Sequence, residues 1–135
     1  MTEMLRSVHS ILLYVQDVQA SLAYYRDALG FQVEFVADAE GGVAGLRLGE
    51  VSLILHSDRE THPGYLPPPG KRGRGVILDF EVEDVDRYHE VLVGRGVAIS
   101  KAPADQAFGL RMMYVYDPDG YNLSFVQRLP VGKKG

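Results

Sequence analysis

One pattern occurs twice in this chain, and it restricts the folds that the chain can adopt. The first copy, Ser10 to Gly30, has alternating apolar residues typical of a strand, then an aspartate, then apolar residues at helical spacing and a glycine. The second copy, Ile77 to Gly96, has the same order at an offset of 67 residues. Asp17 and Asp84 take the same place in both, where a carboxylate caps the first turn of a helix.

Such a repeat has two explanations. Any two βα units share this order, so the likeness alone does not prove duplication. The common V-x-D-V around each aspartate and the strand-rich segments that follow favour duplication. Because one βα unit cannot cover its own apolar face, the repeat predicts two similar modules packed together.

The segments around the two copies complete each module. The predicted fold class is α+β, with two tandem βαβββ modules in one domain of 135 residues: module one at about 8–57, a linker at about 58–74 and module two at about 75–128. The linker is rich in proline and glycine, which excludes a regular helix or a central strand. The remaining strands are expected at 31–36, 43–48 and 51–56, and then at 76–82, 97–100, 110–116 and 122–127, with the second helix at 85–95.

Composition excludes several classes of function. A net charge of −4 with only short basic runs argues against a nucleic-acid partner. The absence of cysteine excludes disulfides, thiolate metal ligands and a cysteine nucleophile. No apolar stretch is long enough to cross a membrane and no signal-peptide core begins the chain, so we expect no membrane partner and a cytoplasmic protein.

Three motifs carry a resemblance to a known family. They are V-x-D-V at 15–18, A-x-Y-R-D-x-L-G-F at 23–31 and D-P-D-G at 117–120. With them the chain resembles the vicinal oxygen chelate superfamily over residues 8 to 128. That superfamily includes glyoxalases, extradiol dioxygenases, fosfomycin-modifying enzymes and bleomycin-resistance proteins. The resemblance implies that each sheet curls around a central cleft, usually in a homodimer.

Strand alternation then predicts which side chains line the cleft. If Ile11, Leu13 and Val15 face the helix, their neighbours face the opposite side, and the same parity extends to the other strands. The candidate ligand-binding residues are Leu12, Tyr14, Ile54, His56, Asp79, Glu81, Met112, Tyr114, Tyr116 and Asn122. Apolar and aromatic walls with a few polar groups are typical of small-molecule pockets, although ordinary packing between sheets explains the same residue types.

The resemblance also implies where a metal would be held. In metal-dependent members four strands supply His, Gln or Glu ligands, and these positions correspond to Ser10, Ile54, Ile77 and Ser124. Isoleucine has no lone pair and a neutral serine hydroxyl is a poor ligand for a divalent cation, so we expect no metal and no other cofactor. A displaced site built from His56, Asp79 and Glu81 is the alternative.

Three functions remain open from the sequence. The first is a metal-free protein that binds a small molecule, with a cationic and aromatic ligand as one option, as in antibiotic sequestration by the bleomycin-resistance members. The second is a lyase, isomerase or dioxygenase that uses a displaced metal or Asp/Glu/His acid–base chemistry. The third is a structural dimer module without a ligand. No catalytic residue is assigned.

Overall fold

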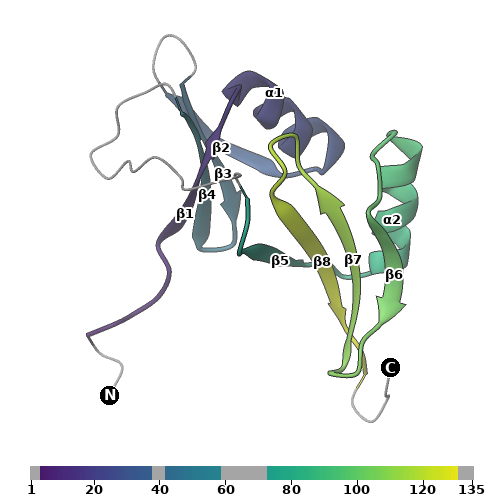
Figure 1. Cartoon of the computed structure of the whole chain (residues 1–135). Coiled ribbons are helices and arrows are strands. Elements are labelled where there is room, and N and C mark those ends of the chain that lie inside the picture. Colours follow the sequence, from purple (N-terminus) through teal and green to yellow (C-terminus); the bar gives the residue numbers. More distant parts are fainter. Residues whose placement is uncertain (1–3, 38–41, 59–72, 131–135) are drawn as a thin grey trace. The chain divides into compact units, whose positions relative to one another are not determined.

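Each half of the chain forms a four-stranded sheet with helical structure on one face (Figure 1). The computed structural model describes residues 4–37, 42–58 and 73–130. Most of the predicted linker, residues 59–72, lies outside the described residues. The chain divides into two compact units, Met1–Pro67 and Pro68–Gly135, and each unit is described by itself below.

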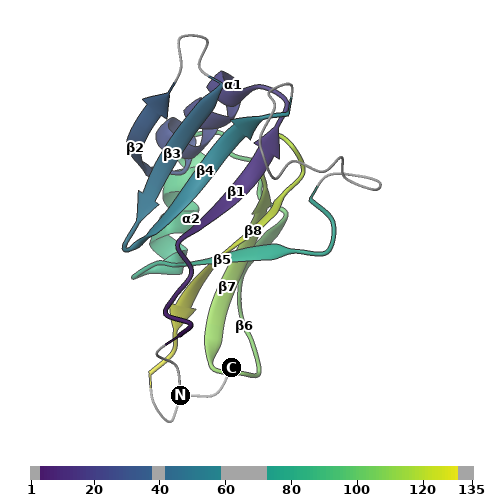
Figure 2. The same cartoon turned by 90° about the vertical axis from the view of Figure 1, so that its left-hand side faces the viewer.

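The first unit has the predicted order βαβββ. Strands β1 and β4 are parallel, while β2–β3 and β3–β4 are antiparallel, in the sheet order β1-β4-β3-β2 that Figure 2 shows. Its elements are β1 (Ser10–Val15), α1 (Val18–Ala23), the π-helix η1 (Tyr24–Ala28), β2 (Gln32–Ala37), β3 (Val43–Leu48) and β4 (Val51–Ser57).

The second unit repeats this topology. Strand β5 is parallel to β8, and the remaining pairs are antiparallel in the order β5-β8-β7-β6. Its elements are β5 (Ile77–Glu81), α2 (Val85–Gly94), β6 (Lys101–Asp105), β7 (Leu110–Tyr116) and β8 (Asn122–Arg128). The prediction of an α+β fold made of two βαβββ modules is therefore confirmed.

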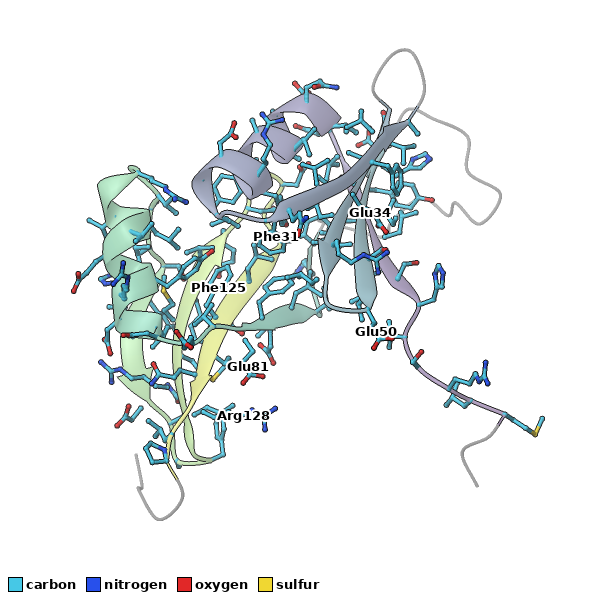
Figure 3. The ribbon with its side chains drawn as sticks, turned by 180° about the vertical axis from the view of Figure 1, so that it is seen from behind. Phe31, Glu34, Glu50, Glu81, Phe125 and Arg128 are labelled. Carbon is cyan, nitrogen blue, oxygen red and sulfur yellow. The ribbon has the colours of Figure 1, made fainter. Side chains whose placement is uncertain are left out.

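Alternation of side chains separates a buried face from an open face in each sheet. Leu13 and Val15 of β1 are buried on the side of α1, as the sequence predicted. In the second unit Phe125 lies between β8 and α2 (Figure 3), with its ring centroid 4.8 Å from that of Tyr88. The largest apolar strand side chains that are fully buried in these two cores are Val15, Leu46, Leu55, Met113, Val115, Leu123 and Phe125.

The predicted ends of both helices are confirmed. The carboxylate of Asp17 accepts a hydrogen bond from the Ala20 N–H, and that of Asp84 accepts one from the Arg87 N–H, both at 3.1 Å. Each aspartate thus satisfies an amide that has no partner inside the helix. Gly30 and Gly96 follow the helices with φ of 89° and 81°, the left-handed conformation that glycine adopts without strain. No helix in the described ranges is long and apolar enough to cross a membrane.

Two predicted elements differ from the structure. The helix expected to continue as one α-helix changes to a π-helix after Ala23, where the Leu29 N–H donates to the Tyr24 carbonyl five residues earlier. The strand expected at 97–100 is wrong, because β6 is formed by 101–105, a segment that the sequence indicated to be a loop. It contains Pro103, and a register irregularity between Lys101 and Ala104 accommodates this residue at the edge of the sheet.

Candidate functional site

The open face of the first sheet has an apolar row at its centre. The strand register aligns Leu12 with Ile54, Ile54 with Gly45, and Gly45 with Phe35, so the row crosses all four strands. The Phe35 ring lies over Gly45, where a β-carbon would overlap it. The absence of a side chain at Gly45 therefore provides the space that the Phe35 ring occupies.

An aromatic pair adjoins this row. Tyr14 and His56 are register partners, and their rings meet edge to face with centroids 5.6 Å apart. The Nδ1 atom of His56 lies 2.8 Å from the Ser57 carbonyl oxygen, which only accepts hydrogen bonds. In the neutral ring Nδ1 therefore carries the proton and Nε2 is the basic nitrogen.

A polar cluster borders the other side of the row. The Glu34 carboxylate forms an ion pair with Arg47 and accepts a hydrogen bond of 2.8 Å from the Ser52 hydroxyl (Figure 3). Glu34 reaches this face because β2 has a bulge between Val33 and Phe35. A bulge places an extra residue against the partner strand and redirects side chains, and bulges are frequent next to binding sites.

On the open face of the second sheet, the central row is polar. The register aligns Asp79 with Ser124, Ser124 with Tyr114, and Tyr114 with Lys101. The fully buried Ser124 hydroxyl donates a hydrogen bond to Asp79, and the Lys101 ammonium lies 5.7 Å from the centroid of the Tyr114 ring. A carboxylate thus lies at one edge of this row and an ammonium, in cation–π range of a tyrosine, at the other.

Two further rows of side chains flank the row of Asp79, one containing Glu81 and the other Asn122. Glu81 forms an ion pair with Arg128 at 3.1 Å, and both side chains are largely exposed (Figure 3). Tyr114 donates a weak hydrogen bond to the Met112 sulfur at 3.9 Å. Asn122 aligns with Ile77 and with Tyr116, and the Asn122 Oδ1 atom is buried without a hydrogen-bond partner among the described residues.

All of the candidate residues predicted from strand parity lie on the sheet face opposite the helix, where Met112 and His56 are nevertheless buried. The first unit contributes Leu12, Tyr14, Ile54 and His56, and the second contributes Asp79, Glu81, Met112, Tyr114, Tyr116 and Asn122. Sequence reasoning missed Glu34, Phe35, Arg47 and Lys101. Glu34 and Phe35 were missed because their positions follow from the bulge in β2. Lys101 was missed because its strand was predicted four residues too early.

The positions at which relatives bind metal do not fit a metal here. Ile54 and Ile77 offer no donor atom, and the Ser124 hydroxyl is fully buried and already donates to Asp79. Ser10 is exposed at the start of β1, and its hydroxyl is neutral. Divalent metals in proteins take imidazole, thiolate or carboxylate donors. Within the part of the chain that the structure describes, no group of three His, Asp or Glu side chains is arranged to hold a metal ion.

Comparison with known proteins gives one family and several relatives. Residues 7–125 match the model of the Glyoxalase/Bleomycin resistance protein/Dioxygenase superfamily. The uncharacterized protein YraH of Bacillus subtilis (strain 168) is 30% identical over 125 residues, which are 88% of this chain and 95% of YraH.

Solved structures agree with this match. A glyoxalase/dioxygenase from Nostoc punctiforme is 29% identical with a TM-score of 0.73, and the match covers 93% of each chain. TioX from Micromonospora sp. ML1 has a TM-score of 0.75 at 22% identity and covers 92% of this chain and 100% of its own, which shows a common fold.

Proposed function

Because the chain belongs to the Glyoxalase/Bleomycin resistance protein/Dioxygenase superfamily, we propose that it binds a small organic molecule on the open faces of its sheets, without a metal at the family's ligand positions. The ligand would combine a flat ring with a cationic group. The function would be sequestration of such a molecule, as in the bleomycin-resistance members of the family.

The chemistry of the four family positions carries this proposal. Two of them are isoleucines, and the buried Ser124 is engaged with Asp79, so the donors that a Lewis acid needs are replaced by packing and internal hydrogen bonding. A surface made of aromatic and aliphatic groups with a few polar atoms suits binding of an organic molecule. In the first unit, Phe35 and Tyr14 supply ring faces and edges for such a ligand.

A thermal-shift titration tests the proposal. Purified protein is analysed for Ni, Zn, Fe and Mn and then melted with each metal, with EDTA, with 9-aminoacridinium and with the uncharged acridine. A ligand at about 100 times its Kd stabilises the folded state by about 2.7 kcal/mol. We expect stabilisation by the cationic ring and none by metals. Stoichiometric bound metal, or a metal-dependent melting temperature, would overturn the proposal.

An acid–base enzyme is the second candidate, and His56 favours it. The Ser57 carbonyl holds the His56 ring so that Nε2 is basic, and the ring lies beside Tyr14 on the open face. Turnover of the hemithioacetal of methylglyoxal and glutathione, lost in His56→Gln while folding is retained, would support this candidate. Absence of turnover with ligand binding intact would favour sequestration.

The homodimer implied by the family is part of the proposal. Sedimentation equilibrium at micromolar concentration should give twice the mass of one chain. A single-chain mass at all concentrations would remove the homodimer from the proposal and leave the binding function to the test above.

A further inference from the structure

Asp79 is a carboxylate with one oxygen that can accept a hydrogen bond from a ligand. It lies on the outer strand β5, its side chain is exposed, and within the described residues it forms no ion pair. Its Oδ1 atom accepts a hydrogen bond from Ser124. Since Ser124 is fully buried, this bond orients the carboxylate and leaves Oδ2 available to a donor from outside the chain.

Asn122 provides a second acceptor on the same face. It lies two residues before Ser124 on β8, about 6.6 Å away along the strand. Its Oδ1 atom is buried and lacks a hydrogen-bond donor among the described residues. Buried polar atoms are nearly always satisfied, so an orphaned acceptor marks a place where a bound molecule supplies an N–H or O–H group.

The neighbouring charges restrict where a cation can bind. Glu81 is neutralised by Arg128, whose Nε lies 3.1 Å from its carboxylate. At the opposite edge of the sheet, the Lys101 ammonium lies over the Tyr114 ring and repels a cation there. The β5 edge near Asp79 is therefore the place on this face that favours a positive group.

We propose that Asp79, oriented by Ser124, and Asn122 form a subsite for a cation that carries N–H donors, such as a primary ammonium or an amidinium group. This inference rests on the proposed function and names the chemical group that the second sheet would bind. A charge-assisted N–H bond to Asp79 and a second N–H bond to Asn122 require donors that a quaternary ammonium lacks. The subsite should therefore discriminate between cations of equal charge.

Three probes with the same ring test this discrimination. Benzylammonium and benzamidinium carry N–H donors, whereas benzyltrimethylammonium has the same charge and none. By isothermal titration calorimetry with the full-length protein, we expect the first two to bind about tenfold or more tightly than the third, the ratio that one hydrogen bond to a charged group supplies.

Variants locate the subsite. Asp79→Asn should lower affinity for benzamidinium about tenfold or more, and Asn122→Ala should lower it and reduce the preference over benzyltrimethylammonium. Glu90→Gln is the control, because Glu90 is an exposed carboxylate on α2 and lies outside the candidate ligand-binding residues, and it should change affinity less than twofold. Melting temperatures of all variants verify folding, and Ser124→Ala gives a second measure of the Asp79 orientation.

The outcomes separate this inference from the proposed function. Equal affinity for the three probes, or equal effects of Asp79→Asn and Glu90→Gln, would overturn the subsite while leaving small-molecule binding intact. Binding of 9-aminoacridinium without binding of any benzyl probe would also overturn it. If no aromatic cation binds at all, both the subsite and the proposed function fail.

Discussion

The first unit's open face depends on a residue without a side chain, Gly45. This glycine is buried in the middle of β3, and its backbone has no positive φ that would require glycine. Its role is steric, because the ring of Phe35 occupies the space that a β-carbon would take. The position of the Phe35 ring is thus determined by the neighbouring strand as much as by Phe35 itself.

Gly45→Ala should therefore destabilise the protein and displace Phe35. The added methyl group overlaps the ring, and overpacking of this kind costs about 1–3 kcal/mol. Urea denaturation measures the change in the free energy of unfolding. Because Phe35→Leu removes the ring, the double variant should recover part of the loss. A Gly45→Ala variant of unchanged stability would show that Phe35 has an equally good alternative position.

Phe35 also shows how far sequence reasoning extends for single side chains. Strict alternation predicted the open faces of β1, β4, β5, β7 and β8 correctly, because these strands are regular. In a regular β2, alternation would put Phe35 on the same face as Val33, but the register places the two on opposite faces. The bulge in β2 adds one residue, so the side chains after Val33 alternate in the opposite sense. No residue type in this segment indicates a bulge.

For whole elements, the errors have a similar cause. A regular strand or helix is determined by local pattern, and β3 and β7 were predicted at their observed bounds. Strand β6 contains Pro103, a residue that normally breaks a strand, and it forms because the edge position and the irregular register remove the need for a hydrogen bond there. Tertiary pairing with β7 overrides the local preference.

A charged contact joins α2 to the sheet of the second unit. The Arg111 guanidinium on β7 donates hydrogen bonds of 3.0 and 2.9 Å to Asp86 in the first turn of α2, and a third of 2.9 Å to Asp105 on β6. The hydrogen bonds from Arg111 hold the pKa of Asp86 below its usual value, with the charges of Arg111 and His89 acting in the same direction. The contact therefore stabilises α2 on the sheet while Asp86 is ionised.

Asp86→Asn should destabilise the protein only where Asp86 is normally charged. A carboxyl with a lowered folded pKa contributes stability above its unfolded pKa, near 3.9, and loses that contribution as the pH falls through the folded pKa. Since the side chains are partly exposed, solvent screening limits the difference to about 0.2–1 kcal/mol at pH 7. Urea denaturation of both proteins between pH 7 and pH 2.5 should show the difference shrinking below pH 4.

The matched control for this contact is Glu90→Gln. Glu90 is exposed on the same helix, and its side chain makes no hydrogen bond or ion pair with the described residues. Its substitution should leave the free energy of unfolding within about 0.5 kcal/mol of the wild type at each pH. A loss in Asp86→Asn that stays constant down to pH 2.5 would contradict an electrostatic origin.

At the scale of the whole chain, the two units share one topology and differ in particular elements. The offset of 67 residues holds for the first strand, the cap and the start of the helix, where Val18 and Val85 are both buried. It fails in the later turns, since the first copy continues as a π-helix and the second remains α-helical to Gly94. The two units share the geometry of the turn from strand to helix. Their open faces differ, because the central row is apolar in the first unit and polar in the second.

This turn allows a direct comparison of the two units through their caps. Asp17 and Asp84 accept from the amide three residues ahead at the same distance, 3.1 Å, from the same extended backbone conformation. Asp17→Ala and Asp84→Ala should each cost about 0.5–2 kcal/mol, whereas the asparagine variants, which keep an accepting oxygen, should cost much less. Because the caps belong to separate compact units and share no partner, the double alanine variant should lose the sum of the two effects to within about 0.5 kcal/mol. Urea denaturation of the five proteins and the wild type measures these differences. A loss confined to one cap would mean that the repeated turns, although alike in geometry, stabilise the two units by different means.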